Sequence, residues 1–259
     1  MVFVNDVLEF LWKLAPEDGK ESWDNVGLLV GRKSRPVTRI LTALDITLPV
    51  IQEAEQLGAE LIVSHHPLIW DTYKFVTDDV LQQGKVMRLI EGKIAAICMH
   101  TNLDEAADGV DDTLAQVLGL CPEQHLAEGR IGHVSVLPEA QPLEEFLKFV
   151  KDRLQAKGLR YYDGGKPVRR IATGCGACGE YLRNAVEAGC DTFLTGDVKY
   201  NVFLDAQGYG INLIDAGHYA TENPIVEKLA GKLQTAFPCV LVSVSQAMIQ
   251  PDCYFVGET

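Results

Sequence analysis

Apolar runs of strand character alternate with stretches of helical character along most of the 259-residue chain. In the first half, the pattern predicts strands at 37–46, 61–66 and 93–100, separated by helices at 49–60 and near 78–91. The second half repeats this rhythm, with strands expected at 168–173, 191–195 and 211–215 and helices near 142–155, 179–188, 198–207 and 221–235. This alternation predicts an α/β protein with largely parallel sheets, arranged as two similar α/β lobes.

A turn-rich segment at 121–132, which follows a predicted helix near 110–118, is the expected connection between the halves. We therefore expect an N-terminal lobe at 1–125 and a C-terminal lobe at 126–259. The boundary is approximate, and the lobes are free to interleave.

The stretch "LIVSHHPLIW" ends an apolar strand on two adjacent histidines, His65 and His66. Neighbouring side chains of a regular strand point to opposite faces, so both rings reach one point only if the strand has already ended. In open α/β sheets, functional residues gather beyond the carboxyl ends of the strands. The pair is therefore expected to serve a site at the tip of its strand.

Two further polar clusters follow predicted strands in the same way. "HTNLD" contains His100 and Asp104, and "AGHYATE" contains His218 and Glu222. In both, an acid follows a histidine by four residues, a spacing that places the two side chains on one face of a helix. Four of the six histidines of the chain fall in these three clusters.

Imidazole and carboxylate groups are the ligands that zinc, iron and manganese use in proteins. Taken singly, each residue has another interpretation: His100 as a packed or capping histidine, Asp104 as a turn residue, and Glu222 as an acid in the first turn of a helix. Three such clusters at strand ends together favour a metal site. A pair of ions a few ångströms apart would also let adjacent histidines diverge and each bind a metal.

The charge and the hydrophobicity of the chain limit the classes of partner and the locations that we expect. The net charge is −13 and no run of Lys or Arg is present, which argues against nucleic acid as the main partner. No stretch approaches the length of a membrane span, and the first 20 residues resemble an amphipathic helix more than an export signal. Seven cysteines in such a chain are expected to be reduced thiols, and we expect a cytoplasmic location.

Cys175 and Cys178 form the one close cysteine pair, in "TGCGACGEY". A zinc ribbon needs a second pair of ligands at short spacing, and none follows. A redox-active pair usually opens a helix after a strand, which is broadly the situation here. The glycines between the cysteines make a tight turn of small residues the simpler interpretation.

The three clusters, together with two further segments, resemble the NGG-interacting factor three family, whose bacterial members are labelled GTP cyclohydrolase I type 2 homologues. The segments that carry this resemblance are "WDNVGLLVG", "SHHPLIW", "HTNLD", "TGDVKY" and "DAGHYATE", in this order along the chain.

The resemblance implies a dinuclear metal site in the cleft between two α/β lobes, and assembly into a toroidal homohexamer. The implied ligands of two divalent transition-metal ions (Zn, Fe or Mn) are His65, His66, Asp104, His218 and Glu222, with His100 at or beside the site. The family often has a histidine where this chain has Asn201, so a histidine role at that position is in doubt.

Asp197, in "TGDVKY", is a candidate general base or a partner of a metal ligand, and helix capping is its alternative. Asp24 and Asn25 precede the strand "VGLLVG" and are candidates to line the cleft, or simply to form a turn. A nucleotide-like small molecule is the expected substrate, although no phosphate-binding loop of the GxxxxGK[ST] type is present.

Two classes of function remain open at this point. The first is a metal-dependent hydrolase, cyclohydrolase-like, that uses metal-activated water. The second is a non-catalytic protein of metal binding, metal handling or adaptor type. Exchangeable coordination positions favour the enzyme, and a closed ligand shell favours storage or sensing.

Overall fold

The computed structural model describes residues 1–255 and divides into two compact units. The first unit comprises Met1–Ala107 and Ile225–Ile249, and the second comprises Asp108–Pro224 with the segment that begins at Gln250. The expected lobes were 1–125 and 126–259, with interleaving left open. The first unit runs to Ala107, and the chain returns to it at Ile225–Ile249. Both units are α/β with largely parallel sheets, so the predicted fold class is confirmed.

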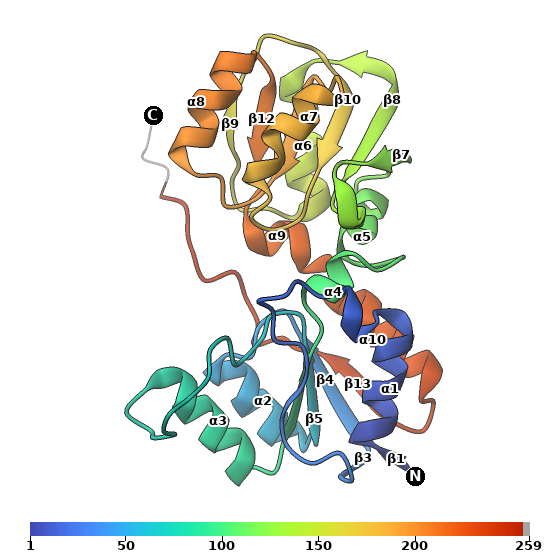
Figure 1. Cartoon of the computed structure of the whole chain (residues 1–259), viewed down its shortest axis with the longest axis vertical. Coiled ribbons are helices and arrows are strands. Elements are labelled where there is room, and N and C mark those ends of the chain that lie inside the picture. The colour runs from blue at the N-terminus through green and yellow to red at the C-terminus, as the bar shows by residue number, and fades with distance from the viewer. Residues whose placement is uncertain (256–259) are drawn as a thin grey trace. The chain divides into compact units, whose positions relative to one another are not determined.

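The first unit is built on a five-stranded sheet (Figure 1). The central strands are buried along their whole length and rich in β-branched and apolar residues, as a sheet covered on both faces requires. Only the last strand of the order is antiparallel to its neighbour. The order is β13 (Leu241–Val244), β4 (Arg39–Ala43), β5 (Leu61–Ser64), β6 (Ala95–Cys98) and β2 (Gly27–Val30).

Helices cover both faces of this sheet, α2 and α3 on one side and α1 and α10 on the other (Figure 1). The ring of Phe10 in α1 packs edge-on against that of Phe237, just after α10, at 5.5 Å between centroids. A short pair of strands, β1 (Val2–Phe3) and β3 (Pro36–Val37), lies at the start of the unit. The helices are α1 (Val4–Leu14), η1 (Glu17–Gly19), α2 (Leu48–Leu57), α3 (Leu81–Glu91), α4 (Thr101–Asp104) and α10 (Pro224–Ala236).

The second unit has a six-stranded sheet in which three parallel strands are flanked by antiparallel ones (Figure 1). The three parallel strands end in polar residues, Thr173, Thr195 and Asp215. The order is β7 (Pro122–His125), β8 (His133–Gln141), β10 (Val168–Thr173), β11 (Thr192–Thr195), β12 (Asn212–Asp215) and β9 (Arg160–Tyr162).

One face of this sheet packs against α7 and α8, where Phe193, Leu213 and Leu182 are buried in a common core. Alternation along β8 turns His133 to the other face, which packs against α5. The helices are α5 (Val110–Val117), η2 (Glu128–Arg130), α6 (Leu143–Leu154), η3 (Gly179–Tyr181), α7 (Leu182–Glu187), α8 (Tyr200–Tyr209) and α9 (His218–Glu222).

Most expected elements are present, with ends shifted by a few residues. Gly58 ends α2 in the left-handed conformation (φ 67°), as expected of a helix stop. The expected connection at 121–132 instead contains β7, which pairs with β8, so polar composition hid a strand there. Among residues 1–255, no helix combines the length and apolarity needed to cross a bilayer.

Candidate metal centre

In the first unit, His65 and His66 follow β5, and His100 follows the adjacent parallel strand β6. One ring nitrogen of each of these three histidines lies within 4.8 Å of those of the other two. Their ring centroids are 4.9 to 5.6 Å apart. The strand pattern breaks after Ser64, whose hydroxyl donates to the carbonyl of His66 at 2.9 Å, and this turn lets both adjacent rings reach one place.

Each of these histidines is held at Nδ1 by an oxygen that can only accept a hydrogen bond. His65 Nδ1 lies 2.8 Å from the Met99 carbonyl, and His66 Nδ1 lies 2.8 Å from Asp45 Oδ1. A carbonyl or ionised carboxylate accepts only, so Nδ1 carries the proton. The Nε2 atom of each ring is therefore the one that presents a lone pair, as in histidines that bind metals.

His100 is held in the same way by Asp24, at 2.9 Å between Nδ1 and Oδ1. Asp24 is buried and also accepts the backbone N–H of Thr101 at 3.0 Å and its hydroxyl at 2.5 Å. Burial alone would raise the pKa of the Asp24 carboxyl. The hydrogen bonds from His100 and Thr101 outweigh it and lower the pKa to about 2, so Asp24 is ionised at neutral pH.

Asp104 lies one helical turn after His100, because α4 begins directly beyond that residue. The backbone N–H of Asp104 donates to the His100 carbonyl at 3.1 Å, which gives the expected i,i+4 spacing its helical form. Asp104 Oδ1 is 3.5 Å from His65 Nε2. The carboxylate is thus next to the three-histidine cluster, although the group whose ligand atoms share one 4.8 Å neighbourhood consists of the histidines alone.

In the second unit, His218 and Glu222 occupy α9, the single turn that follows β12. His218 Nε2 lies 2.9 Å from Glu222 Oε2, so the i,i+4 spacing again brings a histidine and a carboxylate together. His218 Nδ1 is 2.9 Å from Asp197 Oδ2. Asp197 therefore holds the ring at Nδ1, the same arrangement as in the first unit. It does not cap α8, whose N-cap residue is Lys199.

The backbone around this pair is closely packed and depends on glycine. A Cβ atom at Gly196 would lie 2.8 Å from the nitrogen of His218. A Cβ atom at Gly176 would lie 2.1 Å from Glu222 Oε1, and Gly176 also has φ +57°. The loop of Cys175 and Cys178 thus presses its backbone against Glu222, which agrees with the interpretation of this pair as a tight turn of small residues.

Both clusters fit a divalent metal in the chemistry of their donors. Four imidazoles have Nδ1 engaged by an oxygen. The carboxylates of Asp104 and Glu222 lie 3.5 and 2.9 Å from the Nε2 atoms of His65 and His218. Imidazole and carboxylate together suit zinc, iron and manganese. Without a bound cation, protonated imidazoles placed side by side would repel one another. A bound cation would remove this repulsion.

Sequence reasoning missed Asp45 as a partner of His66, and the two tryptophans beside His100. Trp23 and Trp70 are largely exposed, and their rings lie 6.0 and 5.2 Å from the ring of His100. The signal for Asp45 was present, because it lies two residues beyond the end of β4, the strand neighbouring β5. No local signal marks the tryptophans, since contact with His100 depends on how two loops fold.

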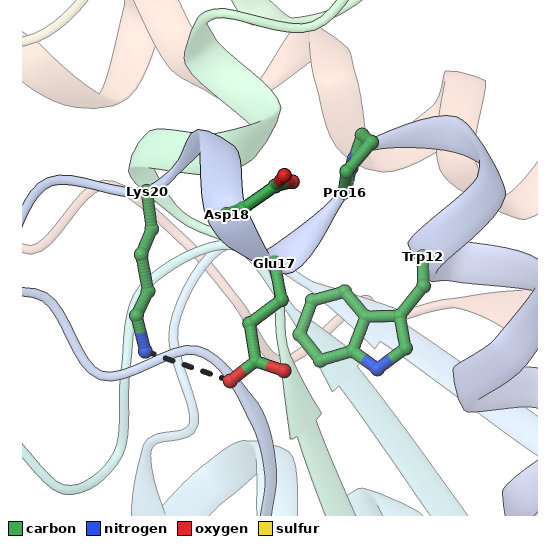
Figure 2. Close-up of a pocket in the computed structure, with 5 residues that line it drawn as sticks. All are labelled: Trp12, Pro16, Glu17, Asp18 and Lys20. Atoms are coloured by element: carbon green, nitrogen blue, oxygen red, sulfur yellow. Dashed lines mark ion pairs between the residues drawn. The ribbon is translucent and has the colours of Figure 1, made fainter.

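Among the surface pockets of these units, two are lined by acidic side chains. One, of about 330 Å³, is lined by Asp197, Lys199, Asn201 and Glu180. The other is an open depression formed by Trp12, Pro16, Glu17, Asp18 and Lys20, in which Glu17 faces Lys20 at 3.7 Å (Figure 2). The second pocket contains none of the candidate metal ligands.

The chain is similar to proteins of known family over nearly its whole length. A GTP cyclohydrolase 1 type 2 homolog of Clostridium perfringens is 35% identical over 238 residues, which cover 89% of this chain and 91% of the relative. One of Clostridium acetobutylicum is 34% identical, covering 96% and 97%.

Solved structures agree. A hypothetical protein of Staphylococcus aureus superposes with a TM-score of 0.88 at 30% identity, over 98% of this chain and 99% of that one. A Bacillus cereus protein related to NIF3 reaches a TM-score of 0.91 at 23% identity, over the same shares, and supports the fold alone. Residues 2–251 match the family described as Duf34/NIF3 (NGG1p interacting factor 3). The chain belongs to this family.

Proposed function

We propose that the protein binds two divalent transition-metal ions, Zn, Fe or Mn, and uses them as a metal-dependent hydrolase of the cyclohydrolase type. The proposed ligands are His65, His66, Asp104, His218 and Glu222, with His100 at or beside the ions. The coarse part of this proposal, a protein with candidate metal-binding groups in a family of GTP cyclohydrolase 1 type 2 homologues, rests on the contacts and relatives described above.

One observation carries the proposal: all four histidines of the two clusters have Nδ1 engaged by a carbonyl or carboxylate oxygen at 2.8 to 2.9 Å. A histidine that only packs in a core also needs a partner for its ring N–H, but it does not need other imidazole or carboxylate groups beside the ring. Ligating histidines need the acceptor at Nδ1, because it fixes both the tautomer and the direction of the lone pair.

Paired divalent cations supply Lewis acidity and lower the pKa of coordinated water. The residues of the chain would hold these ions and orient the side chains that bind them. Asp104, with two carboxylate oxygens, is the proposed bridge between the ions. Asp197 orients His218 and, being largely exposed, is also the candidate to exchange protons with a substrate.

The surroundings support a small-molecule substrate, which we propose to be nucleotide-like. The exposed indoles of Trp23 and Trp70 stand next to His100 and offer flat apolar surfaces. In the second unit, the pocket lined by Asp197 contains Lys199, a cation suited to an anionic group.

We further propose that the chain forms a homohexamer and works in the cytoplasm. The hexamer rests on the resemblance to a ring-forming family. The location rests on seven cysteines, none of which is in a disulfide among residues 1–255. Light scattering tests the assembly, and a monomer at micromolar concentration would contradict it.

The proposed function is tested by purifying the protein without chelator and measuring metal per chain together with hydrolysis. We expect close to two transition-metal ions per chain, and turnover of GTP or of a simpler purine nucleotide that stops after chelation and returns with added metal. Trace metal would contradict the dinuclear site. Full metal loading without turnover of nucleotides or activated esters would reject the hydrolase and favour the metal-handling alternative.

A further inference from the structure

A second group of histidines lies in the C-terminal unit, away from the residues proposed above. His125 and His133 pair across the antiparallel strands β7 and β8, and Thr173 of β10 pairs with His133 on its other side. Directly paired residues place their side chains on the same face of a sheet. Ser135, two residues after His133, shares that face, so four polar side chains stand together on it.

Four polar atoms of this group are buried without a hydrogen-bond partner among residues 1–255: His125 Nδ1, His133 Nδ1, Ser135 Oγ and Thr173 Oγ1. His133, Ser135 and Thr173 are at most 3% exposed. Buried polar atoms normally find partners, because leaving one unmet costs free energy. Several unmet atoms on one face therefore indicate a bound species that the protein chain itself does not supply.

The orientation of His133 indicates which kind of species fits. His133 Nε2 lies 2.6 Å from Asp112 Oδ1, and Asp112 Oδ2 accepts the backbone N–H of Asp108 at 2.5 Å. A carboxylate engaged in this way accepts a proton-bearing nitrogen, so the proton of neutral His133 is on Nε2. The buried Nδ1 then presents a lone pair, and a carboxylate–histidine pair of this form is typical of metal ligands.

His125 supplies a second imidazole close by. The two ring centroids are 5.1 Å apart and the rings are tilted by 34°. With metal–nitrogen bonds of about 2.0–2.1 Å, rings at this separation are close enough for a single ion to bind both. Imidazole nitrogens suit zinc, copper and nickel, whereas a water molecule needs no such pair of ring nitrogens.

The charge around the pair also favours a cation. Asp111 and Asp112 both lie in α5, and the buried Asp111 accepts the N–H groups of Gly132 and Cys175 at 2.7 and 2.9 Å. In the described part of the chain, Asp112 is paired with the guanidinium of Arg130 at 4.0 Å and with the ring of His133 at 2.6 Å.

We propose that His125 and His133 bind a divalent transition-metal ion of the zinc class through their Nδ1 atoms. The hydroxyls of Ser135 and Thr173 complete its surroundings, and Asp112 fixes the ring of His133. This ion would be additional to the two of the proposed function. The role of this ion would be structural. It would link β7 and β8, through His125 and His133, to Thr173 of β10 and to Asp112 of α5.

The experiment counts zinc bound per chain by equilibrium dialysis of the full-length protein after chelator treatment. His125→Gln removes one ligand without touching the His133–Asp112 contact, and Gln124→Ala, an exposed change on the same strand, is the matched control. We expect His125→Gln to bind one zinc ion fewer than wild type, and Gln124→Ala to equal wild type. Equal counts in all three proteins would overturn the proposal and leave the polar atoms to water.

A second variant guards against a folding artefact and against confusion with the main site. Asp112→Asn keeps both ligands but weakens the orienting contact, and should weaken zinc binding at this site about 10–100-fold. His66→Ala/His218→Ala removes two proposed ligands of the main clusters. In this background, His125→Gln should still bind one zinc ion fewer than the protein that keeps His125. A difference that disappears in that background would assign the lost ion to the main clusters and reject this site.

Discussion

The two candidate metal-ligand clusters, one in each unit, both hold histidines through Nδ1. They differ in how far the residues that make these contacts are exposed to solvent. In the first unit, His65 is completely buried and His100 is held by Asp24, which is 6% exposed. In the second unit, His218 is 32% exposed in its side chain and its partner Asp197 is 59% exposed. In both, a histidine directly after a parallel strand, or one short turn later, has Nδ1 engaged by an oxygen. The Nε2 atoms of His65 and His218 each face a carboxylate.

The difference in depth has a physical consequence. A hydrogen bond to a buried carboxylate acts in a low dielectric and is not exposed to competing water, so it fixes a ring firmly. An exposed carboxylate is screened, and its contact contributes less. The first cluster is therefore expected to be the preorganised part of the proposed site, and the second the part that adjusts when metal or substrate binds.

The largest expected effect tests whether Asp104 joins two ions. A carboxylate has two oxygens and can bridge, whereas one imidazole serves one ion through one nitrogen. We predict that Asp104→Ala loses most of both metals, while His65→Ala and His66→Ala each keep an appreciable fraction of one. Metal per chain, with folding checked by circular dichroism, measures this. Wild-type metal content in Asp104→Ala would make Asp104 a turn residue.

The next effect compares the two orienting acids. Asp24→Asn should weaken metal affinity about 10–100-fold, the usual cost of losing a group that orients a ligand. Asp197→Asn should cost less than about tenfold, because its contact is largely exposed to solvent. Competition with a chromophoric chelator gives both affinities. A larger loss in Asp197→Asn than in Asp24→Asn would reverse the proposed roles of the two clusters.

A third prediction concerns acid stability of the metal-free protein. The pKa of Asp24 falls from 3.8 to about 2 on folding, so the ionised carboxylate stabilises the folded state above the unfolded pKa. That contribution, on the order of 2 kcal/mol, is lost as the pH falls from about 4 toward 2. The stability difference between wild type and Asp24→Asn, measured by urea unfolding, should therefore shrink across this window. A difference that grows on acidification would contradict the assigned ionisation.

The smallest effect is expected at the cysteine pair. Cys175 Sγ donates to the Thr221 carbonyl at 3.5 Å and Cys178 Sγ to the Cys175 carbonyl at 3.0 Å, contacts that serine can replace. Replacing both cysteines with serine should leave metal content and assembly unchanged.

Gly176→Ala, in the same loop, is the contrasting variant. Its added Cβ would lie 2.1 Å from Glu222 Oε1, so this change should displace Glu222 and lower metal content. If the double serine variant loses metal and Gly176→Ala does not, the two thiols contribute to metal binding, and the pair is more than a tight turn of small residues.

Local patterns alone predicted much of this protein. The apolar run before His65 predicts a buried strand whatever surrounds it, because its side chains must leave water. Gly58 stops its helix through its own freedom to adopt positive φ. The i,i+4 pair of His218 and Glu222 meets because a single helical turn brings such residues together. These features depend on neighbours in the chain, so the sequence was sufficient for them.

Tertiary structure decided the features that depend on distant residues. Asp24 meets His100 across 76 positions, and β13 joins the first unit beside β4 across about 200. His133 acquires Asp112 from a helix 21 residues earlier, although no acid stands at ligand spacing from it in the sequence. Composition and periodicity indicate which side chains of a segment are buried, but they do not indicate which other segment packs against them. Only packing of the sheets and helices brings these carboxylates to their histidines, and with them the orientation on which metal binding depends.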